Sequence, residues 1–235
     1  MKKKIMPFVV SLLLSTGAFA VDSGKNSVFI DQTNADNSSI SITQTGYGNS
    51  VGDLTNLVVP QFKIDGNNMD MTVTQNGMNN IITGNFIGGA STATVSQIGS
   101  GNSLVLNQGN FGTAAGTMNL SFTGDNNATT FNMATLHDTS SYQYTLTVGG
   151  NQNNITSTMN SKYIQNSIAI TGNGNTYTTT QTGVNGTPLV VGHNITSTII
   201  GNNNTTSITQ NGTTTPNTVT LNVTGNNTAT TIIQH

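Results

Sequence analysis

The chain has 235 residues, only 6% of them charged, with six Lys or Arg, eight Asp or Glu and no cysteine. So few basic side chains argue against nucleic-acid binding, which depends on many Lys and Arg contacts with phosphates. The lack of cysteine excludes disulfides and thiolate metal sites, and the scarcity of charged side chains removes most of the groups that catalysis uses.

Residues 1–20 are predicted to be a secretory signal peptide. A basic start at residues 2–4 precedes an apolar run over 5–14 and the small-x-small sequence at 18–20. The apolar run is too short to span a membrane, and no other run approaches that length. We therefore expect secretion to the cell surface or medium, and a mature chain from Val21 with a net charge of −5, since three Lys and eight Asp remain.

Residues 21–26 are predicted to be a short flexible segment, and residues 27–235 one repeat domain. The domain is rich in Asn, Thr, Gly, Ser and Gln, which is typical either of disorder or of stacked β-structure. The low charge favours β-structure, because disordered segments usually carry more charge. Alternation supports this: Ile40, Ile42 and Gln44 alternate with polar residues, as inward-facing strand residues do.

Steps of eleven residues connect the predicted strands. Upstream of Gln97 the steps reach Phe86, Gln75 and Ile64, and downstream they reach Gln108. Gly- and Asn-rich runs follow these positions and tolerate the positive φ of tight arcs. We predict an all-β solenoid of strand-arc-strand coils, about 22 residues per coil and eight or nine coils, in preference to a sandwich of hairpins, because the register residue recurs at a fixed interval.

Equivalent residues of successive solenoid coils lie about 4.8 Å apart, so Gln and Asn side chains at those positions can form hydrogen-bonded ladders. The alternative is a polar low-complexity sequence without stacking, and the regular spacing argues against it. The predicted ladder and self-assembly residues are Gln44, Asn49, Gln75, Asn80, Gln97, Asn102, Gln108, Asn127, Asn153, Asn175, Gln181, Asn204, Gln210 and Gln234.

The repeats resemble the curlin repeat of bacterial curli fibres, Ser-x5-Gln-x-Gly-x2-Asn-x-Ala-x3-Gln. The best match is Ser91, Gln97, Gly99, Asn102 and Gln108, with Leu in place of the Ala, and the resemblance covers most of residues 27–234. It implies an extracellular amyloid fibre of the biofilm matrix, an outer-membrane secretion apparatus and a second, nucleating subunit as a partner. The flexible segment that the secretion channel reads in the family is very short here.

The end of the sequence supports self-assembly independently. The chain stops one residue after Gln234, inside a predicted strand. A solenoid that stays monomeric needs a polar cap over its last coil, and an uncapped strand offers unpaired backbone groups to another molecule. We therefore expect a homopolymer, with neither catalysis nor cofactor.

Other functions have weaker support. His137, His193 and His235 lack ligand-spaced partners, so solvated histidines are favoured over a metal site. Asp65, Asp70 and Asp125 are expected to cap turns and to oppose aggregation rather than to catalyse hydrolysis.

The alternative function is a monomeric solenoid that binds surfaces. Thr-rich runs such as 178–180 and 196–198 suggest ice binding, but 119–121 breaks the required Thr-x-Thr pattern. An adhesin spacer would normally carry a separate receptor domain, and no composition change marks one.

Overall fold

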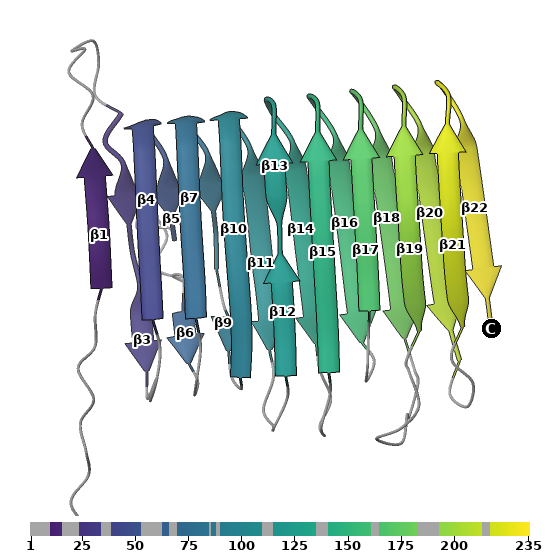
Figure 1. The fold of residues 1–235 in the computed structure, drawn as a ribbon, viewed down its shortest axis with the longest axis horizontal. Coiled ribbons are helices and arrows are strands. Elements are labelled where there is room, and N and C mark those ends of the chain that lie inside the picture. Colours follow the sequence, from purple (N-terminus) through teal and green to yellow (C-terminus); the bar gives the residue numbers. More distant parts are fainter. Residues whose placement is uncertain are drawn as a thin grey trace, which may run out of the picture.

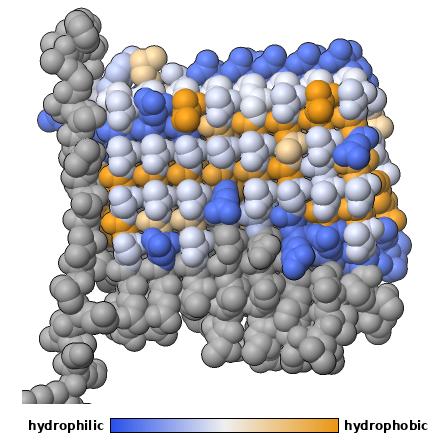
Figure 2. All heavy atoms as spheres, viewed as in Figure 1, coloured by the Kyte–Doolittle hydropathy of each residue, from blue (hydrophilic) through white to orange (hydrophobic). Residues whose placement is uncertain are grey.

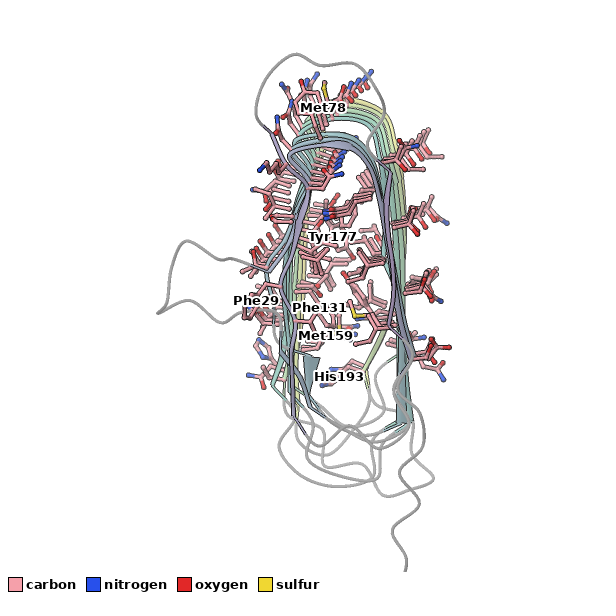
Figure 3. All side chains as sticks on the ribbon, turned by 90° about the vertical axis from the view of Figure 1, so that its left-hand side faces the viewer. Phe29, Met78, Phe131, Met159, Tyr177 and His193 are labelled. Atoms are coloured by element: carbon pink, nitrogen blue, oxygen red, sulfur yellow. The ribbon has the colours of Figure 1, made fainter. Side chains whose placement is uncertain are left out.

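The computed structural model describes residues 10–15, 24–33, 39–52, 63–65, 70–84, 86–87, 90–109, 115–134, 141–160, 165–182, 193–212 and 217–235. In these residues the chain is all β and contains no helix. Two parallel sheets face each other as the walls of a flattened coil, joined at one end by tight arcs (Figures 1 and 3). The fold is the predicted β-solenoid.

Sheet A forms one wall. It contains, in spatial order, β1 (Val10–Ser15), β4 (Ser39–Tyr47), β7 (Asp70–Met78), β10 (Ala90–Ser100), β12 (Ala115–Asn119), β15 (Ser141–Gly149), β17 (Gln165–Thr171), β19 (Asn194–Ile200) and β21 (Thr218–Thr224). The short β13 (Ser121–Thr123) continues the line of β12 between β10 and β15.

Sheet B forms the other wall. Its strands are β2 (Ser27–Val28), β5 (Ser50–Val51), β8 (Ile81–Ile82), β11 (Ser103–Gly109), β14 (Ala128–Ala134), β16 (Asn154–Asn160), β18 (Thr176–Thr182), β20 (Thr205–Asn211) and β22 (Ala229–Gln234). Three short strands, β3 (Asp31–Thr33), β6 (Lys63–Asp65) and β9 (Phe86–Ile87), pair with one another and, through β9, with β11.

Each coil adds one strand position to sheet A and then one to sheet B, and both sheets run through nine positions. Successive residues at the hydrogen-bonded Asn position, which is Thr228 in the last coil, are 22 residues apart in two coils and 23 to 31 apart in the others. The arc from sheet A to sheet B has the same length in every coil, as in Gln44 to Asn49 and Val148 to Asn153. The extra residues therefore lie in the opposite connections.

The core lies between the two walls and is filled from alternate positions of every strand. In β17 and β18, for example, buried residues alternate strictly with exposed or half-buried ones. Phe131 of sheet B meets Tyr144 of sheet A with ring centroids 4.5 Å apart, and both rings are buried. Each buried side chain of this size contributes about 1.5–3 kcal/mol, so the period-two pattern holds the walls together.

The N-terminal edge of sheet A is β1, which pairs in parallel with β4 and places Leu14 opposite Gln44. This strand comes from the predicted signal peptide, whereas the predicted cleavage site at 18–20 and Val21 lie outside the described residues. No helix in the part of the chain that the structure describes is long and apolar enough to cross a membrane.

Candidate functional site

A row of Asn side chains, buried from Asn49 onward, runs along the arc from Asn26 to Asn204. In each coil after the first, the Asn backbone N–H donates to the Oδ1 of the preceding Asn, over 2.9–3.1 Å. Its Nδ2 donates to a Gly carbonyl of the following coil, over 2.8–2.9 Å. We call this row the Asn ladder, and it joins each coil to both of its neighbours.

The predicted ladder Asn residues all lie in this row. The structure brings together Asn49, Asn80, Asn102, Asn127, Asn153, Asn175 and Asn204, and all are buried. Asn26 belongs to it as well, through Asn49, although the sequence placed it in the flexible segment. At the other end Thr228 takes the Asn position, and both its N–H and its hydroxyl donate to Asn204.

A second, exposed ladder is formed by the residue that comes directly after the positive-φ glycine of each arc, such as Gly99 or Gly124. The N–H of Ser100 donates to Asp125 Oδ1 over 2.7 Å, and the N–H of Asp125 donates in turn to Asn151 Oδ1 over 2.7 Å. The same bond continues through the next three coils, to Asn173, Asn202 and Asn226. In this ladder the backbone N–H donates to the following coil, whereas in the Asn ladder the backbone N–H donates to the preceding coil. The repeated Gly-Asp/Asn-x-Asn runs are the sequence signal for this ladder.

The arc itself requires glycine. Gly201 has φ of +131°, and a Cβ there would lie 1.7 Å from the carbonyl oxygen of Gly225. Every arc glycine from Gly46 to Gly201 meets the next coil in this way, at 1.7–2.2 Å. Because Gly225 belongs to the last coil, nothing lies within 4 Å of its added Cβ. Glycine is therefore required at this position by the contact with the next coil, and not only by its positive φ.

The predicted Gln residues form two separate columns at opposite ends of the molecule. In sheet A, Gln44 Nε2 donates to Gln75 Oε1 over 2.7 Å, and Gln75 Nε2 donates to Gln97 Oε1 over 2.9 Å. The next residue in that column is Phe122, so the column becomes apolar.

In sheet B, Gln181 donates to Gln210, and Gln210 donates to Gln234, each over 2.8 Å. Asn166, which the sequence analysis did not single out, donates to Gln181 Oε1 over 2.8 Å and so completes the start of this column. Among the described residues no such donor meets Gln44, whose buried Oε1 has no hydrogen-bond partner there.

Gln108 lies apart from Gln97, the residue eleven positions before it. Gln97 is in β10 of sheet A, whereas Gln108 is in β11 of sheet B, opposite Phe86 and Met133. Its column therefore offers no neighbouring amide, and its ladder role stays a prediction.

The outer surface of sheet A is a flat array of small polar side chains in straight rows (Figure 2). At the two central outward positions of the strands from β4 to β21 the residues are Ser or Thr, except Asn119, Ala169 and Asn222. The Thr runs that the sequence analysis considered are split, because Thr179 and Ser197 are buried while their neighbours face outward.

His193 is a structural residue. It is fully buried at the start of β19, and its Nδ1 accepts the N–H of Asn217 over 3.0 Å. Burial lowers the pKa of His193, which favours the neutral, accepting form. In the described residues no three His, Asp or Glu side chains converge as metal ligands would, and His137 lies outside those residues.

No family model, curated protein or solved structure matches the chain. The resemblance to curlin repeats therefore stays a prediction.

Proposed function

We propose that the chain is a secreted structural protein whose copies stack end to end into extracellular cross-β fibres of the curlin kind. The observation that supports this most is the Asn ladder, which joins every coil to the next by the same bonds. A structure built from one repeated contact can be extended by another copy without any new kind of contact. The proposed role requires neither catalysis nor a cofactor.

The composition of the surface also supports assembly. The chain carries few charges, so little electrostatic repulsion opposes stacking. Within the residues that the structure describes, the last strands of both sheets, β21 and β22, are paired on one side only, and unpaired strand edges are templates for further pairing. A nucleating subunit, an outer-membrane secretion apparatus and a place in the biofilm matrix are the further proposals that the curlin resemblance implies.

Fibre diffraction tests the proposal. The chain from Val21 to His235, diluted from denaturant into plain buffer, should give a meridional reflection near 4.7–4.8 Å and an equatorial one near 10 Å. A soluble β-rich monomer at high concentration would contradict it.

Gly99→Val is the matched control, because a Cβ at Gly99 meets the carbonyl of Gly124 at 2.2 Å. If the fibre consists of stacked solenoids, this variant should not form it. Equal fibre formation would indicate a generic amyloid instead.

A second candidate function is binding to an ordered surface such as ice. The Ser and Thr rows on the outside of sheet A favour it, because they repeat in two dimensions at strand and residue spacing. The test is thermal hysteresis of the freshly diluted monomer, with Thr145→Lys in the centre of the array as the comparison. Hysteresis that Thr145→Lys abolishes would support this function, and its absence would leave assembly as the only candidate.

A further inference from the structure

The two ends of the solenoid carry matching, incompletely covered apolar residues. Of the side chains that the structure describes, four apolar ones that pack on the core are only partly buried: Val28 and Ile30 in the first coil, and Leu221 and Ile232 in the last. One coil further in, the residue before Ile232 in its column, Ile208, is fully buried. Each end therefore resembles an interior coil from which the neighbouring coil has been removed.

The hydrogen bonds at the C-terminal end are also incomplete. Gln234 accepts from Gln210, but its own Nε2, which would donate to a following coil, has no bond to any described residue. The open space beside Gly225 also indicates a missing neighbour, because the next coil covers every earlier arc glycine. The last coil thus lacks the contacts that a following coil makes elsewhere.

The order of the strands along the chain decides which sheets can meet. The first strand after β1 is β2, in sheet B, and β4 of sheet A comes only afterwards. The chain ends with β21 in sheet A and then β22 in sheet B. A following copy therefore presents β2 and β3 to β22, while its β4 is two strand positions away from β21, whether or not β1 is present between them.

We propose that copies join through sheet B, with β22 of one copy paired in parallel with β2 and β3 of the next. This rests on the proposed function and adds the register of the junction. Following the columns of sheet B from strand to strand places Gln234 opposite Gln32, Ile232 opposite Ile30, Thr230 opposite Val28, and Thr228 opposite Asn26. The partly buried apolar residues of sheet B then cover one another.

The backbone directions agree with this register. The N–H of Thr205 donates to the carbonyl of Thr228, and the N–H of Phe29 donates to that of Val51. Because N–H groups alternate in direction along a strand, the N–H of Thr231 points away from β20. It donates to the carbonyl of Val28 of the next copy, and the carbonyl of Thr231 accepts from that copy's Ile30.

The proposed register leaves one buried acceptor of sheet A, Gln44 Oε1, without a partner from β21. Gln44 Oε1 is buried and has no partner, and on its N-terminal side lies the strand position of β1, with Leu14 opposite. In the proposed junction the strand position of β1 separates β4 from β21 of the preceding copy. Sheet A therefore contributes no direct pairing between β21 and β4 of successive copies.

Cysteine crosslinking tests the register, because the natural chain has no cysteine. Ser27 and Ala229 occupy one column of sheet B, and neither side chain is buried. In the proposed junction their Cα atoms are about 4.8 Å apart, within disulfide range. The double variant Ser27→Cys/Ala229→Cys is expressed as the full chain and used in the form that the expression host produces. Its fibres should give covalent dimers, trimers and longer oligomers on mild oxidation.

The comparison variant is Thr43→Cys/Asn222→Cys, which would crosslink only if β21 paired directly with β4. In the proposed junction these positions are about 10 Å apart, beyond disulfide range, so its fibres should yield monomers. Crosslinking of this variant and not of the sheet B variant would overturn the proposed register while the fibre stands. Failure of the natural chain to form fibres would instead overturn the proposed function.

A mixture of two single variants decides the outcome if the double variant does not assemble. Ser27→Cys and Ala229→Cys chains, assembled together, should give disulfide-linked dimers and nothing larger, whereas each variant alone should give none. Fibres of the mixture without dimers would also overturn the register.

Discussion

Asn153 shows how much one residue of the Asn ladder holds together. It donates to Asn127 and to the carbonyl of Gly172, and its Oδ1 accepts both the N–H and the Nδ2 of Asn175. All three Asn side chains in this contact are buried. Each donor or acceptor that loses its partner here is left without water, at a cost of about 1–3 kcal/mol.

We therefore expect Asn153→Ala to lower the free energy of unfolding by about 3 kcal/mol or more, measured by urea denaturation of freshly diluted monomer. Asn151→Ala is the matched control, two residues away in the exposed ladder. Its loss leaves the N–H of Asp125 facing water, so the change should stay below about 1 kcal/mol. Equal effects would show that burial does not decide the strength of these ladders.

The arc glycines give a second comparison at the residue scale. Gly201 and Gly225 both have positive φ, of +131° and +147°, so alanine is strained at either position by about 1–3 kcal/mol. Only at Gly201 does the added Cβ also meet the next coil. Gly201→Ala should therefore lower the urea midpoint distinctly more than Gly225→Ala, and equal midpoints would show that the arc can move apart.

At the scale of the strand, the sheet A column shows that amides and apolar residues occupy the same inward position. Gln44, Gln75 and Gln97 are followed in that column by Phe122 and Val148. Gln75→Leu alone would leave Gln97 Oε1 buried without a donor, at about 1–3 kcal/mol.

Replacing all three Gln residues by Leu removes the donors and acceptors of the Gln–Gln bonds together, which is much less costly than leaving one of them unpaired. The backbone carbonyls of Asn80 and Asn102, which also accept from these amides, keep a backbone N–H donor. The triple variant should therefore be no less stable than Gln75→Leu in the same urea experiment. Losses that add up from residue to residue would contradict this.

The hydrogen bond between His193, just before β19, and Asn217, just before β21, should depend on pH. Because the pKa of His193 is lowered by burial from its ordinary value of 6.5, the unfolded chain takes up the proton first as pH falls. Stability is then fully present above about pH 6.5 and is lost below it. The urea midpoint should fall between pH 7.5 and 5.5. His193→Asn, which keeps an acceptor for Asn217 without titrating, should remove most of that fall.

The same elements show what the sequence could predict. The period-two pattern and the eleven-residue step predicted the strands, the solenoid and the inward direction of Gln97, because both depend on residue spacing alone. They did not show that Gln97 and Gln108 lie in different sheets. Successive steps of eleven residues alternate between the two sheets, and only the strand pairing of β10 and β11 reveals this. The exposed ladder through Asp125 was missed because it depends on the conformation of the arc.

At the scale of the whole molecule, proline at Thr231 tests the edge that the proposed fibre extends. The N–H of Thr231 points away from β20, so proline there removes a bond to the next copy and none within the chain. Thr231→Pro should fold but not form fibres alone, whereas Thr231→Val, which keeps the N–H, should assemble normally. Thioflavin T fluorescence and fibre diffraction would follow both.

Mixing Thr231→Pro with the natural chain shows which end grows. A variant copy can still attach through its β2 and β3 to β22 at a fibre end, where it then presents a blocked edge. If fibres grow at the β22 edge, a small fraction of the variant should stop elongation, because each end needs only one such copy. If they grow at the β2 edge, the variant cannot attach and elongation of the natural chain should be unaffected. Normal fibre formation by Thr231→Pro alone would show that β22 makes no backbone pairing between copies, since a strand cannot extend a parallel sheet through an edge that lacks this donor and carries a proline ring.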